Sequence, residues 1–272
     1  MSFSDTHPGF SPRRVGAMVL RHWYLLRSSW PRTFELIYWP TVQMLMWGFF
    51  QLYLVETSSA FAAAAGVLLG GILLWDVLFR GQLGFSISFL EEMWSRNMGH
   101  LMMTPLRPSE FVASLMTMSL IRVMIGFIPV TFLAIVFFGF NVWQLGFALA
   151  IFFLNLFLTS WSFGLFVSGL VLRNGLGAEN LAWSMMFLLL PLCCVYYPLE
   201  TLPDWLQMIS LALPPTYVFE GMRALLLEQT FRGDLMVWAF ALNAVLFAFA
   251  FWSFMHFYDA SRRAGALLQL GE

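Results

Sequence analysis

Charged residues that could do chemistry are few in this sequence, and several of them lie inside long apolar runs. Asp76 and Arg80 are four residues apart in one run, and Arg122 lies in the next. A charge in hydrocarbon costs several kcal/mol, so such residues pair, reach toward headgroups, or mark a pathway for protons or substrate. We expect Asp76 and Arg80 to pair across one helical turn near the cytoplasmic end of their span.

A proton relay is the alternative interpretation of these charges. It would need a chain of ionisable groups that reaches the middle of the membrane. Glu35 and Glu179 stand only at the entries of two apolar runs, and the outer halves of the runs carry no such group. We therefore favour structural ion pairs, with Arg122 reaching toward the cytoplasmic surface.

No pattern typical of a catalytic or metal centre occurs. The chain has no lysine and no G-x-x-x-x-G-K-[ST] motif, so it cannot form a phosphate-binding P-loop of that kind, and it has no G-x-S-x-G motif. The histidines lack metal-ligand spacing, and the arginines form no stripe for nucleic acid. We expect no catalytic residue, no metal and no cofactor on this chain. The four histidines are His7, His22, His100 and His256.

The elements that hold these charges are expected to be membrane helices. Of the 272 residues 60% are hydrophobic and 11% are charged, whereas about a quarter of a soluble domain is charged. The apolar residues form blocks of about 20, the length that crosses a hydrocarbon core of roughly 30 Å. The sequence predicts one all-α transmembrane domain over 1–272. Its six expected spans are 35–55, 61–85, 110–139, 144–172, 180–197 and 234–258.

The arginines predict the orientation of these spans. They precede the first span, lie between the second and third, and follow the fourth and sixth, while the loops 56–60 and 140–143 have none. Arginine collects on the cytoplasmic side, so we expect both termini to be cytoplasmic. Arg223 and Arg232 are the exceptions. The polar start of the chain has no apolar core, so we expect no cleaved signal peptide.

Residues 12–32 have the pattern of an amphipathic helix. Apolar side chains recur there at helical spacing, and Arg14 and Arg21 fall on the other side. Such a helix would lie along the membrane surface. The alternative is a loop whose periodicity is accidental.

Residues 91–106 join the second and third spans. Trp94, Met98, Leu101 and Met102 fall on one helical face, and prolines end the segment. We interpret it as a short helix that docks a cytoplasmic partner; the alternative is a loop that only connects two spans. The predicted docking residues are Glu91, Glu92, Trp94, Arg96, Asn97, Met98, Leu101, Met102, Thr104 and Pro105.

Residues 198–228 are too polar to cross a bilayer as one helix. Trp205–Leu213 and Tyr217–Glu228 would be two short helices, each too short to span. We expect a re-entrant hairpin that closes the outer side of a pathway, in which Glu220 and Arg223 neutralise each other. The alternative is a loop on the outer surface. The predicted gate residues are Pro198, Leu202, Pro203, Trp205, Pro214, Pro215, Tyr217, Glu220 and Arg223.

The stretch "YYPLETLPDWLQMISLALPPTYVFEGMRALL" resembles the region before the last span of type-2 ATP-binding-cassette (ABC) exporter permeases. Its motifs are Tyr197-Pro198, Leu202-Pro203 with Trp205-Leu206, and Pro214 or Pro215 through Tyr217 and Glu220 to Arg223. "NMGHLMMTPLRPSEF" resembles the segment before span three of the same family, with Thr104-Pro105-Leu106 at its centre. The chain departs from the family at Cys193-Cys194, which we expect to be two small apolar residues in a helix, and at Ala113-Ser114.

The resemblance implies a transport subunit of an ATP-driven exporter. Such permeases work as dimers, homodimeric or paired, with two copies of a separate cytoplasmic ATPase that holds ATP and Mg. The 91–106 helix would be the coupling helix, 12–32 a second contact, and the outer hairpin the external gate. The location would be a bacterial inner membrane, and the substrate an amphiphile or a lipid-linked glycan. The alternatives are a stand-alone secondary transporter or channel, and a membrane-embedded enzyme.

Overall fold

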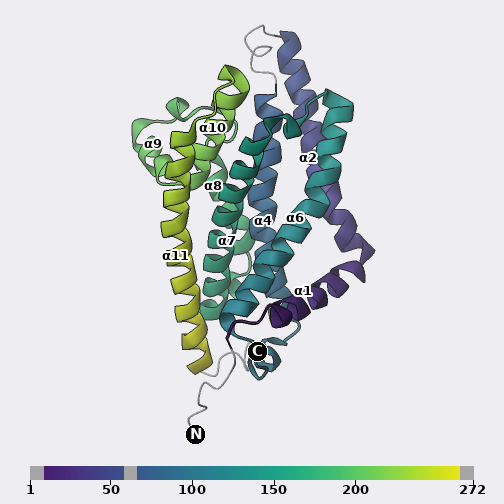
Figure 1. The fold of residues 1–272 in the computed structure, drawn as a ribbon, viewed down its shortest axis with the longest axis vertical. Helices are drawn as coiled ribbons and strands as arrows, with labels where there is room; N and C mark the ends of the chain where they lie inside the picture. Colours follow the sequence, from purple (N-terminus) through teal and green to yellow (C-terminus); the bar gives the residue numbers. More distant parts are fainter. Residues whose placement is uncertain (1–8, 58–65, 264–272) are drawn as a thin grey trace.

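The computed structural model describes residues 9–57 and 66–263, and every regular element within these ranges is helical (Figure 1). In chain order they are α1 (Pro12–Arg27), α2 (Trp30–Thr57), α4 (Val67–Trp94), α5 (Met98–Met102), α6 (Pro108–Phe138), η1 (Val142–Leu145), α7 (Phe147–Asn174), η2 (Leu176–Ala178), α8 (Leu181–Leu192), η3 (Leu199–Thr201), α9 (Asp204–Leu211), α10 (Pro214–Glu228) and α11 (Gly233–Arg263).

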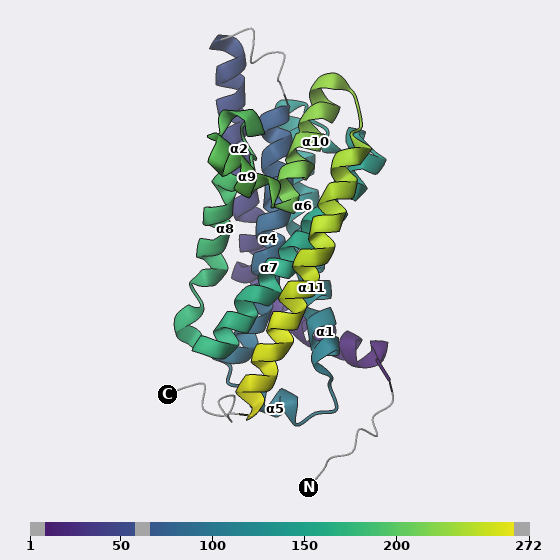
Figure 2. The ribbon, with the colours of Figure 1, turned by 90° about the vertical axis from the view of Figure 1, so that its left-hand side faces the viewer.

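The long helices form a bundle with α4 at its centre. This helix packs against α2, α6 and α7, and α11 packs along α7. In the most apolar window of α4, 72% of the residues are buried, compared with 22% in α11. α1 and α5 lie at one end of the bundle, called here the α1 end, and α9 and α10 lie at the other, called the hairpin end (Figures 1 and 2).

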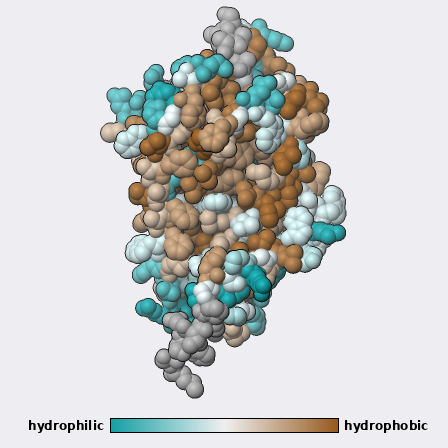
Figure 3. All heavy atoms as spheres, in the orientation of Figure 1, coloured by the Kyte–Doolittle hydropathy of each residue, from teal (hydrophilic) through white to brown (hydrophobic). Residues whose placement is uncertain are grey.

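Within residues 9–57 and 66–263, four helices are long and apolar enough to cross a membrane: α4, α6, α7 and α11. On the face drawn in Figure 3, apolar side chains cover the middle of the molecule and hydrophilic ones gather at its two ends. α2 has the length but carries Arg32, Glu35, Gln43 and Gln51. α8 has 12 residues, whereas about 20 are needed. The structure thus supports a multi-pass protein with four candidate spans and leaves the six-span prediction unconfirmed.

The boundaries of two predicted spans are wrong. The predicted second span ended at residue 85, but α4 continues to Trp94, because its polar residues are buried and bonded within the bundle. Ser88, for example, donates to the Gly84 carbonyl at 2.8 Å. The predicted fifth span reached residue 197, but α8 ends at Leu192, and Cys194 turns the chain with φ +54°. The cysteines therefore form a turn instead of part of a helix. Residues 61–65 of the predicted second span lie outside the described residues.

The predicted helix over 12–32 is two helices. α1 ends at Arg27, and α2 begins at Trp30. Pro31 has no N–H to continue a helix from α1. The amphipathic prediction holds over 12–27, since Met18, His22 and Leu26 are buried. α1 lies across the end of the bundle (Figure 1).

Small and polar residues hold the helices close together. The Ser160 hydroxyl donates to the Leu78 carbonyl of α4 at 2.9 Å. A Cβ at Gly126 of α6 would lie 2.5 Å from the Leu36 carbonyl oxygen of α2. Asn243 of α11 donates to both the backbone and the side-chain oxygen of Asn155 of α7, each at 3.1 Å. Close approach and buried hydrogen bonds are what membrane helices use where hydrophobicity cannot drive association.

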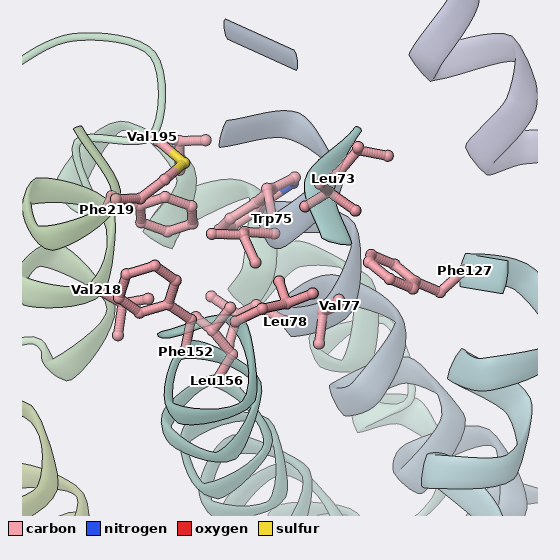
Figure 4. Close-up of a cluster of buried hydrophobic side chains, with 14 of the residues drawn as sticks. Leu73, Trp75, Val77, Leu78, Phe127, Phe152, Leu156, Val195, Val218 and Phe219 are labelled. Carbon is pink, nitrogen blue, oxygen red and sulfur yellow. The ribbon is translucent and has the colours of Figure 1, made fainter. Parts of the chain in front are cut away.

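The hairpin end is part of the main apolar core. Val218 and Phe219 of α10 are fully buried. They lie on the α10 side of a cluster that includes Trp75 of α4 and Phe152 of α7 (Figure 4). A Cβ at Gly71 of α4 would lie 2.8 Å from the Val195 carbonyl oxygen, just before the hairpin. α10 and the turn before it are therefore packed into the bundle, while the re-entrant arrangement of the whole hairpin stays a prediction.

Candidate coupling, gating and intramembrane sites

Two adjacent carboxylates at the α1 end of α4 bind arginines from other helices. Glu91 accepts two bonds from Nη2 of Arg122 in α6, at 3.0 and 3.1 Å, and one from Nη1 of Arg32 in α2, at 3.3 Å. Oε2 of Glu92 lies 3.0 Å from Nη2 of Arg21 in α1. The end of α4 is thus linked by ion pairs to α1, α2 and α6.

His22 of α1 lies between the same two carboxylates. Its Nδ1 is 3.7 Å from Glu91 Oε2, and its Nε2 is 3.7 Å from Glu92 Oε1. The imidazole is fully buried, and neither nitrogen has a hydrogen-bond partner among the described residues. Over the described ranges no cluster of three or more His, Cys, Asp or Glu side chains could hold a metal. No spacing pattern indicates that His22 meets Glu91 and Glu92, because nearly 70 residues separate them.

Glu110 fixes the start of α1 to the start of α6. Its carboxylate accepts bonds from Nε and Nη2 of Arg14 at 2.7 and 2.6 Å, from the Ser11 N–H at 2.8 Å and from the Arg107 N–H at 3.0 Å. The bond to Glu110 raises the pKa of the Arg14 guanidinium above its ordinary value. α1 is therefore held at its start by Glu110 of α6 and near its middle by Glu92 of α4.

These contacts show that some of the predicted docking residues face the bundle instead of a partner. Glu91 and Glu92 were predicted to meet a partner, but in this conformation their carboxylates bind arginines of the chain itself. Asn97 also donates to Glu92, at 2.8 Å. Trp94 is exposed and donates through Nε1 to Glu179 at 2.7 Å. The segment therefore has an inner, ion-paired part and an outer part that faces away from the bundle.

The predicted continuous helix from residue 91 is wrong. The chain turns after Trp94, and this turn changes which side chains face the bundle. α4 ends at Trp94; the Asn97 N–H then bonds the Glu92 carbonyl, and the Arg96 N–H bonds the Met93 carbonyl. This is a Schellman motif, with Arg96 in the left-handed conformation that glycine usually supplies. The five-residue α5 follows.

The break buries part of the expected docking face. Met98 is 4% exposed and packs in the core, and Leu101 is half-buried. Met103, which the prediction omitted, is 73% exposed. The Met102 side chain lies outside the described part of the structure. The exposed residues of this segment, called here the outer strip, are Trp94, Ser95, Arg96, His100, Met103, Thr104 and Pro105.

The predicted ion pair in the hairpin is confirmed. Nη2 of Arg223 lies 2.6 Å from Glu220 Oε1, and the same oxygen accepts the Leu199 N–H at 2.8 Å. Nη1 of Arg223 donates to the Val195 carbonyl at 3.4 Å. The pair therefore joins α10 to both the turn before the hairpin and the hairpin's first residues.

The other predicted gate residues shape the two short helices. Pro198 and Pro203 precede η3 and α9, and Pro214 and Pro215 start α10. The Tyr217 hydroxyl donates to the Leu211 carbonyl at 2.9 Å, which ties α10 back to α9. The other two differ in exposure: Leu202 is half-buried, and Trp205 is exposed. The two-helix prediction is thus correct, and its gate role stays a prediction.

The Asp76–Arg80 pair is confirmed, but its expected position is wrong. Nε of Arg80 lies 2.6 Å from Asp76 Oδ1. α4 runs from Val67 to Trp94, so Arg80 is at its midpoint and not near its end. The pair lies near the middle of the most buried helix, where an ionisable group marks a functional site by default.

The family comparison matches a part of the chain that includes the ion pairs at the α1 end, the Asp76–Arg80 pair and the hairpin. The ABC-2 type transporter family matches residues 15–227, more than half of the chain. The chain belongs to the ABC-2 type transporter family. The match runs from α1 through the α4 charges to the hairpin, and it ends near the end of α10. A comparison with curated proteins gave no match. An ABC-2 domain is the membrane component of a transporter, so this chain is a multi-pass permease component.

Proposed function

We propose that this chain is the membrane subunit of an ATP-driven exporter. It works as a dimer, with itself or with a paired permease, and it is driven by two copies of a separate ATPase subunit that bind ATP and Mg²⁺. Membership of the ABC-2 family supports a permease role. The absence of lysine from the chain supports a separate ATPase, because the P-loop motif needs one.

The observation that carries the proposal is the continuity of α4. This helix has 28 residues, which gives a rod of about 42 Å. Glu91 and Glu92 bind α1, α2 and α6 at one end, and Gly71 and Trp75 touch the turn and core of the hairpin at the other. A push on the α1 end would therefore be carried along α4 to the hairpin.

We also propose a role for each end of the bundle. The outer strip and α1 face the ATPase in the cytoplasm, and the hairpin is the external gate. The arginines support this orientation, since the α1 end carries most of them and cytoplasmic loops are enriched in such residues. We place the protein in a bacterial inner membrane with both termini cytoplasmic, and we propose an amphiphile or a lipid-linked glycan as substrate.

A co-purification experiment tests the proposal. The full chain is expressed with the soluble P-loop ATPase encoded beside it, and the ATPase that co-purifies is measured. Met103→Asp in the outer strip should reduce it about tenfold, because a charge enters an apolar contact. Met208→Asp is the matched control, since Met208 is 69% exposed at the hairpin end, and it should retain the ATPase.

Met98→Asp would not serve as a docking test. Met98 is packed in the core beside Phe111 and Met93, so a carboxylate there would disrupt folding. Undiminished ATPase binding by Met103→Asp would exclude the outer strip as the contact. Transport by the purified chain alone in vesicles, with no ATPase present, would overturn the proposed function and favour a secondary transporter or channel.

A further inference from the structure

A cleft that has both apolar and charged side chains in its lining runs along one face of α4, between α2, α6 and α8. Its volume is about 290 Å³. Arg80, Ile87, Glu91 and Trp94 line it at helical spacing, so it follows α4 for about four turns, roughly 21 Å. It opens beside Glu35, which is exposed. Ligand pockets start near 300 Å³, so the cleft has room for a headgroup and not for a whole amphiphile.

Two arginines in this cleft have donors that nothing in the described structure uses. Arg80 bonds Asp76 through Nε, and neither of its Nη groups has an acceptor among the described residues. Arg122 is 6% exposed and bonds Glu91 through Nη2, and its buried Nε has no partner there. A buried donor left unpaired is costly. Arg80 therefore offers the cleft N–H donors that no acceptor in the described structure uses, whereas the Nε of Arg122 is enclosed by the protein.

These unused N–H donors indicate the chemistry of the ligand. Guanidinium donors in a planar fork match the oxygens of a phosphate or carboxylate. Three arginines line the cleft (32, 80 and 122), and Asp76, Glu35 and Glu91 balance them. The cleft therefore has no net charge, and an anion would be held there by the geometry of its N–H donors rather than by an excess of positive charge.

Apolar side chains continue the cleft beside the charged ones. Leu36, Leu83 and Ile87 line it together with Trp183 of α8. A headgroup at Arg80 and Arg122 would therefore leave its attached apolar chain against these residues. A free polar solute would gain nothing from this part of the lining.

We infer that this cleft binds the phosphorylated headgroup of an amphiphile, with the phosphate oxygens on Arg80 and Arg122. The inference rests on the proposed function in one respect, that the bound amphiphile is the exporter's substrate. The binding itself needs no ATPase, and it is measured on the purified full chain alone.

The experiment compares probes that differ by one phosphate. Dioctanoyl phosphatidic acid and dioctanoylglycerol have the same tails, and their Kd values are measured with the chain in micelles of a detergent that carries no phosphate. Phosphatidic acid should bind at least tenfold more tightly, the effect of added charge-assisted hydrogen bonds. Octyl glucoside tests an uncharged sugar headgroup, and inorganic phosphate tests the anion without a lipid.

A double variant tests the residues. Asp76→Asn with Arg80→Gln removes both charges together and so leaves no unmatched partner. It should weaken phosphatidic acid binding about tenfold and leave dioctanoylglycerol binding unchanged. Arg232→Gln with Asp234→Asn neutralises a pair of the same kind, 2.7 Å apart and exposed at the hairpin end, and it should change neither Kd.

The outcomes separate the possibilities. Equal binding of phosphatidic acid and dioctanoylglycerol, or preference for octyl glucoside, overturns the inference without any variant. Unchanged phosphatidic acid binding in a folded double variant overturns it too. Competition by inorganic phosphate at equal concentration would support the contact between phosphate and the arginines. It would also assign the site to a free anion and so overturn the inference of a lipid headgroup. If the chain binds phosphatidic acid selectively but recruits no ATPase, the inference about the cleft holds and the proposed function fails.

Discussion

Breaking the Glu220–Arg223 pair one residue at a time should cost more than removing it whole. The Arg223 side chain is 8% exposed, and that of Glu220 is 26% exposed. Removing one partner of a buried pair costs about 3–5 kcal/mol, because it leaves an uncompensated charge, whereas an apolar replacement of both is often close to neutral. The structure also predicts that the two single variants differ.

The difference follows from what each variant leaves behind. Glu220→Leu strands a buried guanidinium and the Leu199 N–H, which bonds Glu220 Oε1, so we expect the full 3–5 kcal/mol, roughly. Arg223→Met leaves a carboxylate that is partly exposed and still accepts the Leu199 N–H, so we expect about 1–3 kcal/mol. The double variant should lie within about 1–2 kcal/mol of the unaltered chain, since only the Leu199 and Val195 contacts are lost.

The assay is a double-mutant cycle on thermal unfolding of the purified chain in one detergent. The same cycle on Arg232 and Asp234, both exposed, is the control and should show almost no coupling. If the two single losses at Glu220 and Arg223 add in the double variant, the residues do not act as a pair. The ion pair would then not contribute to holding the hairpin in place.

Two further variants test the packing of the bundle by unfolding measurements. Gly126→Ala should destabilise by about 1–3 kcal/mol, because the new Cβ meets the Leu36 carbonyl; Gly177→Ala, with no heavy atom within 4 Å of its Cβ, should have little effect. Asn243→Ala should cost about 1–3 kcal/mol, because it leaves the buried side-chain oxygen of Asn155 in α7 without its donor. Gln229→Ala is its exposed control. Losses in the two controls that match those of their test variants would contradict the packing described here.

Local pairs were predictable from the sequence, and distant ones were not. Asp76 and Arg80 are four residues apart and Glu220 and Arg223 are three apart, so helical spacing alone brings each pair together. Glu110, by contrast, meets a residue 96 positions earlier, Arg14. Without knowing which helices are neighbours, no spacing rule selects such partners. The sequence therefore indicated which charges needed partners more reliably than which partners they had.

The end of α4 was mispredicted for a different reason. The polar residues after position 85 indicate the end of a span in a hydropathy profile, but Ser86, Ser88 and Glu92 are buried in the bundle. Arg96 then adopts a left-handed conformation that is uncommon without glycine. A periodicity that runs through this turn assigns Met98 to the wrong face. The error in one boundary thus displaced both the docking surface and the midpoint of the helix.

The ion pairs also limit which parts of the molecule can move. Separating Arg122 from Glu91 would leave buried charges unpaired, at about 3–5 kcal/mol, and Arg21–Glu92 and Arg14–Glu110 would have to part as well for α1 to leave α4 and α6. Any transport motion that keeps these pairs must move α1, α4 and α6 together. Among the described residues no ion pair joins the hairpin to the other helices; apolar contacts and hydrogen bonds hold it there, and apolar contacts slide at lower cost than charges separate. Movement of α4 against the hairpin is therefore less costly than movement of α4 against α1 or α6.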